Sequence, residues 1–99
     1  MKFRAHPLTA YTVRAAIAHY LGVPTPTVEL RQTFARDLGM DALDIALAAA
    51  PLGSALRIEI ALHGLEDTHT VGALAERVES ALREDERRTA AALGQRGAA

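Results

Sequence analysis

The sequence predicts a single all-α domain. Its 99 residues give room for one hydrophobic core and little else. Alanine accounts for 21 residues and only four are aromatic, so the apolar content comes in small side chains that suit closely packed helices. Apolar residues also recur at helical spacing in segments near both ends of the chain. We expect an N-terminal extension over residues 1–8, a helical domain over residues 9–88 and a flexible tail over residues 89–99.

Composition and charge exclude several classes of function. The chain has no cysteine, which excludes disulfides, thiolate catalysis and Cys-ligated zinc. Its formal net charge is −1, so no overall field favours nucleic acid or an anionic membrane. No stretch is long and apolar enough to span a membrane, and residues 1–4 are not followed by the apolar segment of a signal peptide. We expect a cytoplasmic monomer that binds neither nucleic acid nor membrane.

The first predicted helix covers residues 10–21. Thr9 can cap its N-terminus, and Gly22 can take the left-handed conformation that ends a helix. The apolar residues between them follow helical spacing: Val13, Ala16, Ile17, Tyr20 and Leu21.

A long loop is expected between this helix and Met40, because Pro24 and Pro26 cannot continue the helix and no regular period follows them. A loop of this length in a small domain is usually packed down or functional. Four apolar residues can anchor it: Val28, Leu30, Phe34 and Leu38.

The second predicted helix begins after Asp41, which can cap it. Asp44 then adds negative charge near the positive end of the helix dipole. Pro51 lacks an amide hydrogen and its ring clashes with a preceding carbonyl, so we expect the helix to stop or kink near Ala50.

Beyond that helix, Ile58 and Ile60 alternate with charged residues as in a strand, but no second strand pattern exists to pair with them. We therefore expect a connection there, with a short helix around residues 62–66. Thr70 can cap a longer last helix, supported by apolar residues and two ion pairs: Val71, Leu74, Ala75, Val78 and Leu82, with Glu79–Arg83 and Glu84–Arg88.

Five landmarks occur in order along the chain: Leu21-Gly22-Val23, Phe34 ahead of Asp37-Leu38-Gly39, Asp41 with Leu43 and Asp44, Ile58-Glu59-Ile60, and Thr70-Val71. Their sequence and spacing resemble acyl carrier proteins, the phosphopantetheine-binding carrier family, over roughly residues 11–85. The resemblance implies a four-helix bundle of acyl-carrier-protein type with a long first loop and a short third helix. It also implies a protein without enzymatic activity that acts by being bound.

The resemblance assigns Ala42 to the position at which the family attaches its cofactor. There a serine hydroxyl is coupled to the phosphopantetheine arm, whereas alanine has no hydroxyl, so as written we expect no cofactor. One interpretation is a genuine carrier studied as an engineered serine-to-alanine apo form. A second is a natural carrier-like protein that has lost the arm. A third is attachment of the arm at another serine, and the chain has only Ser54 and Ser80 for this.

The second interpretation is favoured, because one deliberate substitution would not also introduce Pro51 or remove acidic residues from the second helix. Leu47 stands where the family commonly has a glutamate, and residues 53–55 replace a usually acidic stretch. The function expected is therefore an interaction module related to fatty-acid or polyketide metabolism.

Partner enzymes of acyl metabolism are expected to dock on the second helix, as the resemblance implies. The residues expected to contact them are Asp37, Asp41, Leu43, Asp44, Ile45 and Leu47. Because the three apolar members cannot all share one narrow helical face, we expect Ile45 or Leu47 to be exposed.

His63 and His69 flank Glu66 and Asp67, and imidazoles with carboxylates can form metal or acid–base sites. The spacing fits no established metal motif, so a solvated turn before the last helix is the favoured interpretation and no metal is expected. A small hydrolase built on these histidines lacks a suitably placed nucleophile.

Overall fold

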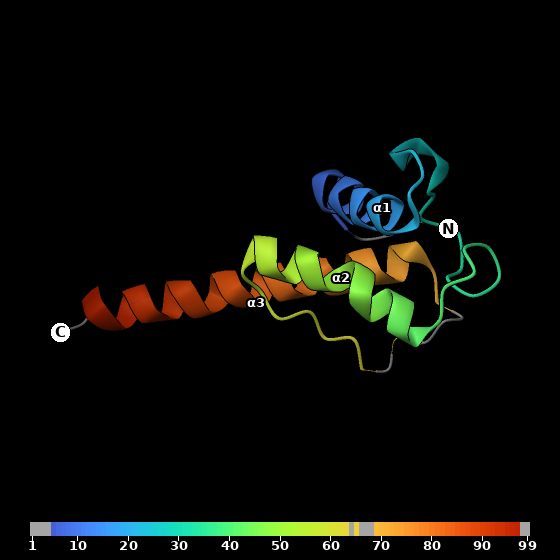
Figure 1. Cartoon of the computed structure of the whole chain (residues 1–99). Helices are drawn as coiled ribbons and strands as arrows, with labels where there is room; N and C mark the ends of the chain where they lie inside the picture. The colour runs from blue at the N-terminus through green and yellow to red at the C-terminus, as the bar shows by residue number, and fades with distance from the viewer. Residues whose placement is uncertain (1–4, 64, 66–68, 98–99) are drawn as a thin grey trace.

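Three α-helices and one 3-10 turn form the described part of the chain in the computed structural model, which describes residues 5–63, 65 and 69–97. The helices are α1 (Pro7–Leu21), α2 (Ala42–Leu56) and α3 (Val71–Gly97), and the turn is η1 (Thr25–Thr27). Helix α1 packs against α2, α3 and η1. Figure 1 shows the bundle gathered around the first half of α3, with the last turns of α3 extending beyond it. The prediction of an all-α fold is confirmed.

The predicted fourth element, a short helix around residues 62–66, does not form at the residues that are described there. Leu62 and Leu65 are not helical, and a turn joins them through a 3.0 Å hydrogen bond from the Leu65 amide to the Leu62 carbonyl. Gly64 and Glu66 lie outside the described residues. The described part of the bundle therefore has three helices where the resemblance implied four.

The connection between α2 and α3 forms no strand at residues 58–62, as the sequence predicted. Ile58, Ile60 and Leu62 pack against the core, while the residues that alternate with them are exposed. This period of two explains why no helix forms, because a helix would turn some of these side chains away from the core. Arg77 holds the connection down by donating to the carbonyls of Ala61 at 2.8 Å and His63 at 2.9 Å.

Helix α1 begins at Pro7, within the segment expected to be an N-terminal extension, and its N-cap is His6 rather than Thr9. The His6 Nδ1 atom accepts a 3.1 Å hydrogen bond from the Leu8 amide. Proline is well suited to the first helical position, where its missing amide hydrogen would have no helical partner. The predicted end is confirmed, since Gly22 has a left-handed φ of 72°.

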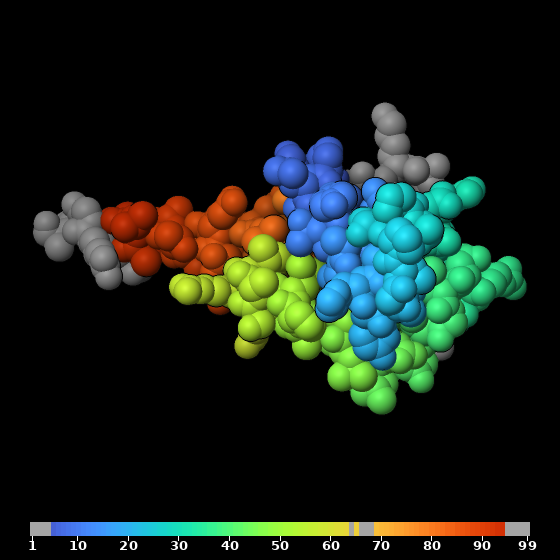
Figure 2. All heavy atoms as spheres, turned by 45° about the horizontal axis from the view of Figure 1, so that its top comes forward, coloured from blue at the N-terminus to red at the C-terminus, as the bar shows by residue number. Residues whose placement is uncertain are grey.

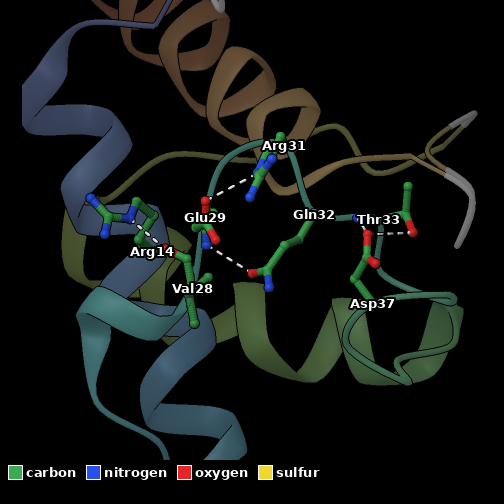
Figure 3. Close-up of polar contacts among 7 residues, drawn as sticks. All are labelled: Arg14, Val28, Glu29, Arg31, Gln32, Thr33 and Asp37. Atoms are coloured by element: carbon green, nitrogen blue, oxygen red, sulfur yellow. Dashed lines mark hydrogen bonds and ion pairs between the residues drawn. The ribbon is translucent and has the colours of Figure 1, made fainter.

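The long first loop is packed down as expected. Val28, Phe34 and Met40 are buried in the core. Arg14 of α1 donates a 2.6 Å hydrogen bond from Nε to the Val28 carbonyl, and Gln32 Oε1 accepts one of 2.8 Å from the Glu29 amide (Figure 3). Buried apolar side chains and hydrogen bonds together hold the first loop in place, although it has little regular structure.

The same loop completes the N-terminus of α3. The first two amides of α3, those of Val71 and Gly72, donate to the carbonyls of Gln32 at 2.9 Å and Leu30 at 2.8 Å. The Ala73 amide donates to Thr70 Oγ1 at 3.1 Å, which confirms Thr70 as the cap. Helix ends leave such amides without helical partners, so this long-range pairing fixes where α3 starts.

Helix α2 continues through Pro51 (Figure 1), so of the two outcomes expected near Ala50, a stop or a kink, the stop is wrong. Proline removes the bond that its amide would make to the Leu47 carbonyl. Leu47 and Pro51 are both on the exposed side of the helix, where water can bind that carbonyl. Ile45, Ala48, Ala49 and Leu52 are buried on the opposite side and hold the helix to the core.

Helix α3 extends to Gly97, through the segment expected to fray. Residues 83–94 are all exposed, and Figure 2 shows these last turns projecting from the bundle. Side-chain pairs along the helix support it: Arg83 lies 3.8 Å from Glu79, as predicted, and Glu84 pairs at 3.1 Å with Arg87, one residue before the predicted partner Arg88. The alanine-rich composition of this segment also favours a helix.

No helix in the described part of the chain is both long and apolar enough to cross a membrane.

Candidate docking site at the start of α2

A reciprocal pair of hydrogen bonds fixes the start of α2. Asp41 Oδ1 accepts from the Asp44 amide at 2.9 Å, and Asp44 Oδ2 accepts from the Asp41 amide at 3.0 Å. This capping box satisfies two amides that helix formation would leave unpaired, and it places negative charge at the positive end of the dipole. Asp41 is thus confirmed as the cap, and Ala42 is the first helical residue.

Tyr20 joins this cap to α1, a contact that helical spacing alone did not predict. Its hydroxyl donates a 2.6 Å hydrogen bond to Asp44 Oδ1, so both oxygens of the Asp44 carboxylate accept hydrogen bonds. The Tyr20 bond, together with the Asp41 amide, holds the pKa of Asp44 below its ordinary value, and the same bond raises the pKa of Tyr20. Tyr20 had been assigned only to the apolar face of its helix, although its hydroxyl was a signal of a polar contact.

The side chain of Asp37 forms hydrogen bonds within the first loop. Its Oδ2 atom accepts from the Thr33 amide at 2.8 Å and from the Thr33 hydroxyl at 3.2 Å (Figure 3). This closes the turn that precedes Gly39, whose φ of 64° is left-handed. The Asp37 side chain is exposed, but its hydrogen bonds give it a structural role in the loop.

The three apolar residues expected to contact partners are divided between surface and core. Leu43 and Leu47 are 66% and 51% exposed, whereas Ile45 is only 2% exposed. Of the alternatives given for an exposed residue, Leu47 is the correct one. Ile45 is buried because the helical period turns its side chain into the bundle. We define the docking face as the candidate surface made of the exposed residues Asp41, Leu43, Leu47 and Tyr20 and the partly exposed Asp44.

Ala42 is exposed at the start of α2, one residue after the cap. Ser54 and Ser80 are also exposed, but Ser54 lies in the last turns of α2 and Ser80 inside α3. Among these three positions only residue 42 lies at the beginning of a helix.

The small residues of α2 act in two ways. Ala48 is buried and lets the helices approach closely. Ala46, Ala50 and Gly53, in contrast, border a hollow of about 250 Å³, closed on its other side by Ile58, Ile60 and Leu62. A Cβ atom on Gly53 would lie 3.1 Å from the Ile58 carbonyl oxygen, so glycine allows the connection to approach the helix there.

The structure shows no metal site at His63 and His69 among the residues that it describes. The backbone carbonyl of His63 accepts from Arg77, and that of His69 accepts from the Phe34 amide at 3.0 Å. Glu66 and Asp67 lie outside the described residues. Over residues 5–63, 65 and 69–97, no group of three potential ligands is suitably placed to hold a metal ion.

A helical bundle with a packed first loop and a capped second helix has the architecture of a carrier domain. Residues 12–78, more than half of the chain, match the family described as phosphopantetheine attachment site. The chain belongs to this family of carrier domains, which are non-catalytic and dock with partner enzymes. No curated protein and no solved structure gives a significant match.

Tyr20→Phe is expected to raise the pKa of Asp44, because it removes the largest cause of the lowered value. A carboxylate with a lowered pKa stabilises the fold above its unfolded-state pKa, and this contribution is lost as the pH falls through its folded-state pKa. The variant should therefore be less stable than the wild type at neutral pH, and the difference should shrink in acid. Carbon NMR titration of the Asp44 carboxyl group and urea unfolding at several pH values measure both effects.

Tyr11→Phe is the matched control, since Tyr11 lies on the same helix and is 57% exposed. It should leave the Asp44 titration unchanged. An unchanged Asp44 titration in Tyr20→Phe would contradict the assigned hydrogen bond.

Proposed function

We propose that this protein is a carrier-like interaction module that cannot hold phosphopantetheine at residue 42 and acts through the proteins that bind it. The observation that carries the proposal is the exposed methyl group of Ala42 at the first position of α2. Attachment of the arm requires a side-chain oxygen to form the phosphodiester, and a methyl group supplies none. Membership of the phosphopantetheine attachment site family supports the general mode of action.

We propose the docking face as the surface that partners contact. It combines the carboxylates of Asp41 and Asp44 with the exposed side chains of Leu43 and Leu47. Exposed carboxylates favour a partner with a basic surface and raise the association rate more than the affinity. The aliphatic side chains would add apolar contact area at the centre of the interface. Partners of this chemistry would be enzymes of acyl metabolism.

A genuine carrier studied as an engineered apo form is the second candidate. The intact capping box, which sets the beginning of α2 at residue 42, favours it. The two candidates differ in the natural coding sequence, which would specify serine at codon 42 for an engineered form and alanine for a natural one.

Restoring a hydroxyl at residue 42 tests whether the docking face still works. Wild type and Ala42→Ser are incubated with coenzyme A and a broad-specificity phosphopantetheinyl transferase, and intact masses are measured. We expect Ala42→Ser to gain one phosphopantetheine group and the wild type to gain none. The wild-type result also tests Ser54 and Ser80, the other serines of the chain.

Ala55→Ser is the matched control, because Ala55 is an exposed alanine near the other end of α2. It should remain unmodified. Modification of the wild type would overturn the proposal that the arm is absent. Failure of Ala42→Ser to react would contradict a carrier-type docking face at the start of α2.

A further inference from the structure

The first turn of α1 is capped by an imidazole. His6 Nδ1 accepts a 3.1 Å hydrogen bond from the amide of Leu8. A neutral imidazole can accept at Nδ1 when its proton is on Nε2, but an imidazolium carries protons on both nitrogens and accepts at neither. This cap therefore exists in one protonation state of His6 only.

The same turn is tied to α3 by a carboxylate. Glu79 Oε1 accepts a 2.9 Å hydrogen bond from the His6 amide, and the Thr9 hydroxyl also bonds to this carboxyl group. Figure 2 shows the start of α1, in dark blue, next to α3, in orange. Leu8 is 72% exposed, and among residues 7–10 only Ala10 is buried, so the turn has few buried apolar contacts. Segments with few buried apolar contacts open at a low free-energy cost.

Among the described residues, the charged groups that face this turn come from α3. They are Glu79 and Arg83, whose Nε lies 3.8 Å from Glu79 Oε2, and Glu76 borders the same hollow of α3. The His6 amide, followed by the Thr9 hydroxyl, holds the pKa of Glu79 below its ordinary value. Glu79 therefore stays ionised in mild acid, whereas histidine is the side chain that normally changes charge between about pH 5 and 8.

We propose that His6 is an acid-sensitive latch: protonation of its Nδ1 breaks the cap on Leu8 and opens the first turn of α1, residues 7–10. The new proton also places positive charge at the positive end of the α1 dipole, which disfavours the helix. Attraction between the imidazolium and Glu79 opposes the opening. His6 is exposed, however, and exposed ion pairs contribute little. The inference is independent of residue 42 and of partner docking.

Amide hydrogen exchange of Leu8, measured by NMR as a protection factor, tests the latch. In the full-length wild type, protection should fall by about fivefold between pH 7.5 and pH 5.5, the size expected for loss of one helix cap. His6→Asn should keep equal protection at both pH values, because asparagine caps helices well and does not titrate. His6→Ala should show low protection at both.

His19→Asn provides the control, since His19 lies in the last turn of the same helix. It should retain the wild-type response at Leu8. Equal protection of the wild type at both pH values would overturn the proposal, as would the same fall in His6→Asn. Wild-type protection of His6→Ala at pH 7.5 would overturn it too, because the imidazole would then not be holding the turn.

Discussion

Phe34→Ala is expected to destabilise the protein by about 3–5 kcal/mol, the usual cost of truncating a buried phenylalanine. The Phe34 side chain is 0% exposed although it comes from the first loop. Its backbone joins two other segments, because its amide donates to His69 at 3.0 Å and its carbonyl accepts from Met40 at 2.7 Å. The cavity would therefore form where the loop meets the start of α3. Urea or thermal unfolding followed by circular dichroism measures the loss.

This loss is a large part of the free energy of unfolding of a small domain, which is about 5–15 kcal/mol. Tyr11→Ala truncates an aromatic residue that is 57% exposed and should change the stability by no more than about 0.5 kcal/mol. Equal losses in the two variants would show that the first loop is not anchored by Phe34.

Pro51→Ala is expected to stabilise the protein by about 1–2 kcal/mol. Proline inside a helix is about 3 kcal/mol less favourable than alanine, because it lacks the amide hydrogen and its ring clashes with a carbonyl. Part of the gain is offset, since alanine leaves the unfolded chain more conformational freedom. The side chain of residue 51 is exposed, so no core packing changes. The free energy of unfolding in urea, compared between the two proteins, measures the gain.

Pro7→Ala is the matched control. Pro7 is the first residue of α1, where the missing amide hydrogen costs nothing, so this replacement should bring no gain. A loss of stability in Pro51→Ala would show that proline is favourable at this position and that the helix has adapted to it.

The elements that the sequence predicted well are those defined by neighbouring residues. Asp41 and Thr70 cap α2 and α3, and Gly22 ends α1, because each acts on backbone groups within a few positions of itself. The same local signals indicated the start of α2, and with it the position of Ala42 in the candidate site. The lack of a second strand pattern likewise predicted that Ile58 and Ile60 lie in a connection and not in a strand.

The predictions that were wrong depended on contacts with other elements. Helix α1 starts at Pro7, where the local His6 cap on Leu8 is joined by a bond from the His6 amide to Glu79, which is distant in sequence. Helix α2 passes through Pro51 because burial on the opposite side holds it to the bundle. The side chain of Ile45, expected to be a possible exposed residue, is buried against the same core, and the hydroxyl of Tyr20 bonds to Asp44 of a different helix.

The sequence by itself determined the all-helical class, the caps of two helices and the absence of a hydroxyl at residue 42, because these depend on side-chain chemistry and on adjacent backbone groups. Only the tertiary structure decided which face of α2 is exposed and which polar groups hold the start of α1. Those features arise from burial and from hydrogen bonds between distant segments, and local sequence does not encode which segments will meet.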